Sequence, residues 1–143
     1  PLTLVLQGFG ENASGESQFW RRLPTEAEAR HMFWASLLAR PSEVLYWTWY
    51  RADRIWIEEV LSPIIREFRS LFPRGIEYRT ATGIEASGGS VALLLLSNED
   101  GDDWLLIVSR QAKPARILVA WPTGVRTTID IESYGISLVP APF

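Results

Sequence analysis

The sequence predicts a mixed fold in which two strand–helix units of a parallel sheet precede a small antiparallel β-sandwich. Residues 1–73 alternate between extended and helical patterns, whereas residues 74–143 contain short extended segments without any helical period. The chain has 143 residues, of which 47% are apolar and 22% charged, as in ordinary folded domains. We therefore expect two parts, 1–73 and 74–143. A single compact α+β domain, with two helices on one mostly antiparallel sheet, remains an alternative.

The first unit begins with an apolar run over residues 2–9, which is typical of a buried strand. The period of two places Leu2, Leu4 and Leu6 on one face, and Thr3, Val5 and Gln7 on the other. Glycine, asparagine and serine follow over residues 8–15 and predict a loop.

The first helix is predicted from Thr25. Thr25 is the expected N-cap, and Glu28 three residues later completes a capping box. Pro41 ends the helix. The core-facing residues follow at helical spacing: Ala29, Met32, Phe33, Ser36 and Leu37.

The second unit pairs a strand over residues 42–50 with a helix over residues 53–72. Asp53 is the expected N-cap of that helix. Pro63 interrupts the helical pattern, and Ser62 before it predicts a kink or a restart. The predicted apolar stripe is Ile57, Val60, Leu61, Ile64, Phe68 and Leu71.

The second half predicts six strands, because extended segments recur at short intervals between turn residues. They are residues 76–80, 90–97, 104–110, 116–121, 126–131 and 136–139. The turns include 87–89 and the acidic tip 98–102, which predicts a polar hairpin end more readily than a calcium site.

The predicted parallel pair poses a packing problem. Parallel strands are normally covered on both faces, whereas two helices on one side leave the other face bare. Thr3, Val5 and Gln7 then need a cover. The later strands of this chain, a further segment, or another protein chain would each provide it.

Composition excludes several classes of function. A net charge of −3 and a pI near 5.2 argue against a nucleic-acid partner. Zero cysteines exclude thiol chemistry and zinc sites built on cysteine, one histidine argues against a histidine-rich metal site or a Ser–His triad, and no cofactor is expected. The apolar run 91–96 is far too short to cross a membrane. The compartment stays open.

Four segments carry a resemblance to a known architecture: 1–10 (PLTLVLQGFG), 24–38 (PTEAEARHMFWASLL), 44–50 (VLYWTWY) and 68–73 (FRSLFP). In this order they resemble the seventh and eighth strand–helix units of (β/α)8-barrel glycoside hydrolases. A β-sandwich often follows the barrel in such enzymes, and residues 103–109 and 134–140 are similar to its strands. The resemblance implies that six barrel strands lie outside this chain.

The resemblance also implies where chemistry would occur, because barrel active sites form at the carboxyl ends of the strands. Retaining barrel enzymes usually carry a nucleophilic glutamate at the end of the seventh strand. Gln7 occupies that position here and cannot be a nucleophile. Gln7 is therefore expected to contact substrate, and Glu11, four residues further on, is the catalytic candidate.

The end of the second strand supplies the other candidates, Trp47, Trp49, Tyr50 and Arg51. Flat aromatic rings suit the apolar faces of sugars, and the guanidinium of Arg51 suits a hydroxyl or carboxylate. Alternating aromatic residues also suit a strand core, so both interpretations stay open.

Together these features predict part of an enzyme that hydrolyses glycosidic bonds. We expect carbohydrate as substrate, the remaining barrel segment or another chain as protein partner, and no activity from this chain alone. The alternative is a stand-alone α+β binding or assembly module without catalysis.

Overall fold

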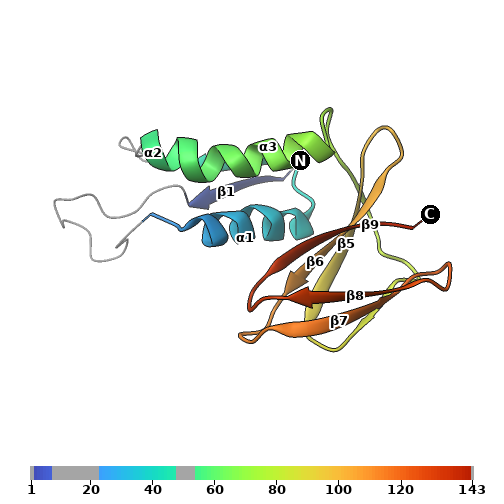
Figure 1. Ribbon diagram of the computed structural model, residues 1–143. Helices are drawn as coiled ribbons and strands as arrows, with labels where there is room; N and C mark the ends of the chain where they lie inside the picture. The colour runs from blue at the N-terminus through green and yellow to red at the C-terminus, as the bar shows by residue number, and fades with distance from the viewer. Residues whose placement is uncertain (1, 8–22, 48–53, 143) are drawn as a thin grey trace. The chain divides into compact units, whose positions relative to one another are not determined.

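The computed structural model describes residues 2–7, 23–47 and 54–142 of the chain. The chain divides into two compact units, Pro1–Ser70 and Leu71–Phe143 (Figure 1). The first contains two parallel strands with helices, and the second contains antiparallel sheets. The predicted fold class, α/β followed by all-β, is confirmed.

The first unit alternates strand and helix. Its elements are β1 (Thr3–Gln7), α1 (Glu26–Ser36), a 3-10 turn η1 (Leu37–Ala39), β2 (Glu43–Trp47), α2 (Arg54–Trp56), a π-helical turn η2 (Ile57–Leu61) and α3 (Ser62–Leu71). Figure 1 shows β1 alongside α1 and the helix that runs from α2 to α3.

β1 and β2 are parallel and in register from Thr3↔Glu43 to Gln7↔Trp47. The amide of Ser42 donates to the carbonyl of Leu2 at 2.8 Å, which extends the pairing by one step. The side chain of Ser42 in turn accepts from the Leu2 amide at 3.3 Å. The predicted parallel pairing is therefore present over these five register pairs, and residues 8–9 and 48–50 of the two predicted strands lie outside the described residues.

The predicted capping box at the start of α1 is confirmed. The Glu28 amide donates to Thr25 Oγ1 at 3.3 Å, and the Thr25 amide donates to Glu28 Oε2 at 2.8 Å. The helix tightens into η1 and ends at Arg40, whose φ of 52° is left-handed. Pro41 follows directly, as the sequence predicted.

The sequence predicts a kink or a restart at Pro63. The restart is wrong, because the helix after β2 continues through this position. Ser62 has helical backbone angles and is not an N-cap, and its amide donates to the Ile57 carbonyl across a π turn. The Ser62 hydroxyl donates to the same carbonyl at 2.8 Å. A proline ring clashes with the carbonyl four residues before it, and the wider π turn relieves that clash without ending the helix.

The second unit contains two antiparallel sheets. One has the strand order β3 (Glu77–Arg79), β5 (Val91–Ser97), β6 (Asp103–Ser109) and β9 (Ile136–Pro140). The other has the order β4 (Glu85–Ser87), β7 (Ala115–Ala120) and β8 (Arg126–Ile131). The six predicted strands are present with slightly different ends, and β4 is an additional strand that the sequence analysis missed.

The extended conformation of β4 comes from its pairing with β7, because the composition of its three residues does not favour a strand. Its three residues pair with β7, with Ala86 opposite Val119. Gly88, which follows the strand, has a φ of +97°, and a Cβ there would lie 2.2 Å from the Arg116 carbonyl oxygen. A glycine is therefore needed for β4 to approach β7.

The core of the second unit lies between the two sheets. Leu95, Leu105 and Ile107 come from the first sheet, and Ile117 and Val119 come from the second. All five are buried. The two sheets therefore form a sandwich with a shared apolar interior.

Candidate functional site

The carboxyl ends of β1 and β2 lie next to each other. Gln7 and Trp47 are the last residues of the two strands and are register partners. Parallel pairing thus brings together two positions that are 40 residues apart in sequence. In parallel α/β structures, ligands bind at this edge of the sheet, where the carboxyl ends of the strands meet.

Two of the six predicted site residues lie within the part of the chain that the structure describes. The structure describes the backbone of Gln7 and Trp47 at the strand ends. The catalytic candidate Glu11 and the binding candidates Trp49, Tyr50 and Arg51 lie outside the described residues.

Two aromatic residues brace this end of the first unit. Trp56 is buried, and its Nε1–H donates to the Pro24 carbonyl oxygen at 2.7 Å. Its ring lies 6.3 Å from that of Tyr46, whose hydroxyl donates to the Ala29 carbonyl at 3.4 Å. The start of α2, the start of α1 and strand β2 are thereby joined. Partial burial also raises the pKa of the Tyr46 hydroxyl well above its ordinary value.

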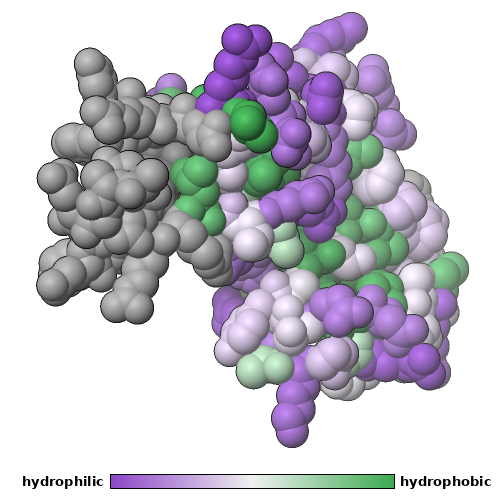
Figure 2. All heavy atoms as spheres, turned by 60° about the vertical axis from the view of Figure 1, so that its left-hand side comes forward, coloured by the Kyte–Doolittle hydropathy of each residue, from purple (hydrophilic) through white to green (hydrophobic). Residues whose placement is uncertain are grey.

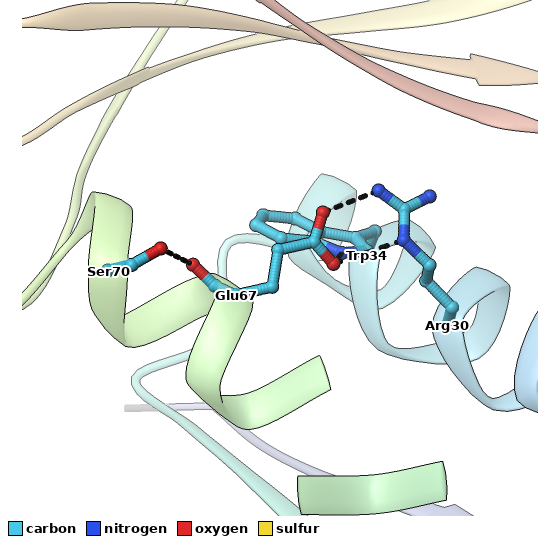
Figure 3. A network of polar contacts seen from close by, with 4 residues as sticks. All are labelled: Arg30, Trp34, Glu67 and Ser70. Atoms are coloured by element: carbon cyan, nitrogen blue, oxygen red, sulfur yellow. Dashed lines mark hydrogen bonds and ion pairs between the residues drawn. The ribbon is translucent and has the colours of Figure 1, made fainter. Parts of the chain in front are cut away.

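A second group of contacts joins α1 to α3 (Figure 3). The Arg30 guanidinium meets the Glu67 carboxylate in a bidentate pair, with Nη2–Oε1 at 2.6 Å and Nε–Oε2 at 3.0 Å. The buried Trp34 donates from Nε1 to Glu67 Oε2 at 3.3 Å. Such a fork geometry fixes orientation as well as separation, so these contacts hold the two helices in one arrangement.

The sequence analysis did not predict that Trp34 and Trp56 would join elements of the first unit. Trp34 and Trp56 were outside the predicted apolar stripes, yet both are buried. The available signal was their residue type, because a tryptophan on a helix is usually buried with its N–H satisfied.

The two faces of the β1–β2 sheet differ. Leu4, Leu6, Val44 and Tyr46 are half-buried on the helix side. On the opposite face Val5 is 54% exposed and its register partner Leu45 is 45% exposed. Figure 2 shows that apolar residues reach the surface of the described chain among a majority of hydrophilic ones. The predicted bare face that bears Val5 is therefore present.

Polar residues mark the amino end of this bare face. Thr3 and Glu43 are exposed register partners, and Thr3 Oγ1 donates to Glu43 Oε2 at 3.2 Å. The face therefore changes from polar at the amino end to apolar at Val5 and Leu45.

The acidic hairpin between β5 and β6 is stabilised by its own side chains. Asn98 Oδ1 accepts from the amides of Asp100 and Asp102 at 3.0 and 2.9 Å. Asn98 Nδ2 donates to Asp102 Oδ2 at 3.1 Å. Within the described residues, no group of three metal-ligating side chains is placed to hold an ion. The contacts are those of a polar hairpin tip.

No family model matches the chain, and no curated protein or solved structure matches it. Among the described helices, none has the length and apolar character needed to cross a membrane. A functional assignment therefore depends on the order of the elements and on the residues at the strand ends.

Proposed function

We propose that this chain is the carboxyl-terminal part of a barrel-type glycoside hydrolase. In this proposal β1 and β2 are two neighbouring strands of the barrel, and the second unit is an accessory β-sandwich. The substrate is a carbohydrate, and the reaction is hydrolysis of a glycosidic bond.

The observation that carries the proposal is the asymmetric parallel pair. β1 and β2 run in the same direction, each is followed by a helix, and the face bearing Val5 and Leu45 is exposed. A parallel sheet of two strands with one bare face is a poor isolated structure, because parallel sheets occur with both faces covered. A closed barrel supplies that cover, since further strands line its interior.

The strand ends support a sugar site. Gln7 and Trp47 are register partners at the edge where barrel enzymes bind their substrates. An amide hydrogen-bonds sugar hydroxyls, and an indole ring stacks on the apolar face of a sugar. In the sequence, Glu11 follows β1, while Trp49, Tyr50 and Arg51 follow β2.

The reaction requires two carboxyl groups on opposite sides of the scissile bond. In the proposal Glu11 supplies one of them, and the general acid comes from a part of the enzyme outside this chain. The acid protonates the leaving oxygen as the glycosidic C–O bond breaks. The carboxylate either attacks the anomeric carbon to give a glycosyl-enzyme that water then hydrolyses, or it activates the water that attacks the anomeric carbon directly. The 143-residue chain alone is therefore expected to be inactive.

The proposal is tested by expressing the complete reading frame that contains this sequence. Its product is assayed on a panel of aryl glycosides and oligosaccharides, beside the 143-residue chain. We expect turnover only from the longer product. Glu11→Gln should lower kcat by about 10²-fold or more, whereas the matched variant Glu16→Gln should retain activity.

Binding is measured separately by tryptophan fluorescence during oligosaccharide titration, with Trp47→Ala as the control. We expect saturable quenching in the longer product that Trp47→Ala weakens. An inactive longer product without oligosaccharide binding would contradict the proposal. If the 143-residue chain were then monodisperse and cooperatively folded, the stand-alone module would be the better account.

A further inference from the structure

We infer that the bare face of the β1–β2 sheet is covered by parallel strands that bring an arginine or lysine to Glu43. This inference rests on the proposed function, because it takes the covering strands to be those of the same barrel. It adds the chemistry that these strands must carry.

The middle of the face requires an apolar cover. Val5 and Leu45 are register partners, and about half of each side chain is exposed to water. Covering them removes apolar surface from water, which favours an apolar strand opposite them. Within the described residues, each strand of the pair also has one unpaired edge, on which a further strand can continue the ladder.

The amino end of the face requires a cation. Glu43 is exposed next to Val5 and Leu45 in the register, and among the described residues the Thr3 hydroxyl is the partner of its carboxylate. One neutral hydrogen bond does not compensate a carboxylate for the loss of water. A strand that covers Val5 and Leu45 would also shield Glu43, so it must offer a guanidinium or ammonium group there.

The same charge argues against a second copy as the cover. The described residues of this face are Thr3, Val5, Glu43 and Leu45, which include one carboxylate and no cation. Packing two such faces together would shield two carboxylates without supplying a positive charge. A different segment with a basic residue fits the face better than a copy of the face itself.

The test compares the 143-residue chain with the product of the complete reading frame by carboxyl labelling with a carbodiimide and glycine ethyl ester. We expect Glu43 to be labelled severalfold more slowly in the longer product. The matched control is Glu85 in the second unit, which is also exposed in the chain and should label equally in both samples.

Melting temperatures then test for the cation. Glu43→Gln should lower the Tm of the longer product by roughly 5 °C or more, because it leaves a buried cation unpaired. It should leave the Tm of the 143-residue chain nearly unchanged, as should Glu85→Gln in both samples. Glycosidase activity and oligosaccharide binding are scored separately, so a protected Glu43 in a product that has neither would contradict the proposed function and support the inferred cover of this face.

Three outcomes would overturn the inference. The first is equal labelling of Glu43 in both samples, which a reading frame without further strands would also give. The second is protection of Glu43 that depends on the concentration of the 143-residue chain and accompanies a dimer in light scattering, since the cover would then be a second copy. The third is a protected Glu43 whose glutamine variant does not lower the Tm of the longer product.

Discussion

Two ion pairs in the first unit have the same chemistry but different surroundings. Arg30 and Glu67 join separate helices, and their side chains are each 33% exposed. Arg54 and Glu58 lie four residues apart on one helical segment, and their side chains are 89% and 58% exposed. Water screens the second pair more strongly, so the first should contribute more to stability.

Glu67→Gln should lower the free energy of unfolding by about 1–2 kcal/mol. The substitution removes the charge of the carboxylate that pairs with Arg30 in a bidentate geometry and also accepts from Trp34. Glu58→Gln, as the exposed control, should cost no more than about 0.5 kcal/mol. Urea unfolding followed by circular dichroism measures both. Equal losses in the two variants would show that the contacts of Glu67 contribute no more to stability than those of the exposed pair.

The Tyr46 hydroxyl should make stability fall in alkaline solution. Burial raises its pKa in the folded chain, so the unfolded chain releases this proton first. The contribution of the protonated Tyr46 hydroxyl to folding stability is fully present below the ordinary tyrosine pKa of about 10, and it is lost as the pH rises above that value. In melts between about pH 8 and about pH 11, Tyr46→Phe should reduce the fall in Tm. The exposed Tyr134, replaced by phenylalanine, is the control, and an equal effect of both variants would contradict this assignment.

At the scale of elements, the π turn explains why Trp56 and not Ile57 is buried. Along a regular helix at about 100° per residue, Ile57 would share a face with Ile64, and Trp56 would lie roughly 80° away. The π turn over Ile57–Leu61 inserts about one residue and rotates Trp56 onto the face of the buried Ile64. Periodicity alone cannot foresee this shift.

Trp56→Phe should destabilise the chain by about 1–3 kcal/mol, because it leaves the Pro24 carbonyl without its hydrogen bond. Trp34→Phe is the matched control, since Glu67 keeps its contacts with Arg30 after the indole is lost. We expect the loss in Trp34→Phe to be smaller by about 1 kcal/mol. Equal losses would mean that ring volume, and not the hydrogen bond, anchors Trp56.

Local chemistry made several elements predictable from the sequence. The capping box of Thr25 and Glu28 depends on adjacent residues, and the parallel pair follows from two strand–helix units in succession. β4 was not predictable, because three residues without a β-branched or aromatic side chain become a strand only through β7. Of the candidate site, Gln7 and Trp47 could be placed at the strand ends. The burial of Trp34 and Trp56 could have been suspected from their residue type, but their partners Glu67 and Pro24 are 33 and 32 residues away in sequence and could not be foreseen.

At the scale of the whole molecule, the sandwich core of the second unit and the bare face of the first unit differ in how completely their apolar residues are buried. Leu105, in the sandwich, is fully buried, whereas Leu45, in the parallel sheet, is 45% exposed. An apolar residue that stays in water contributes little to stability and favours association between chains. The first unit should therefore respond to substitution on its bare face less than the second responds in its core.

Leu45→Lys should change the stability of the 143-residue chain by no more than about 0.5 kcal/mol and should increase its solubility. Leu105→Ala should cost about 2–5 kcal/mol, because it opens a cavity between the two sheets. Urea unfolding and light scattering measure the two effects. A large loss of stability in Leu45→Lys would mean that this face is already covered within the chain.

Hydrogen exchange at β1 and β2 tests the central claim most directly, because it reports whether the parallel pair is part of a larger sheet. The 143-residue chain and the product of the complete reading frame are compared, with β6 as the internal reference for a strand that is already paired on both sides. We predict that amides of β1 and β2 exchange quickly in the chain alone and orders of magnitude more slowly in the longer product, while those of β6 change little. Equal exchange of β1 and β2 in the two samples would contradict the account.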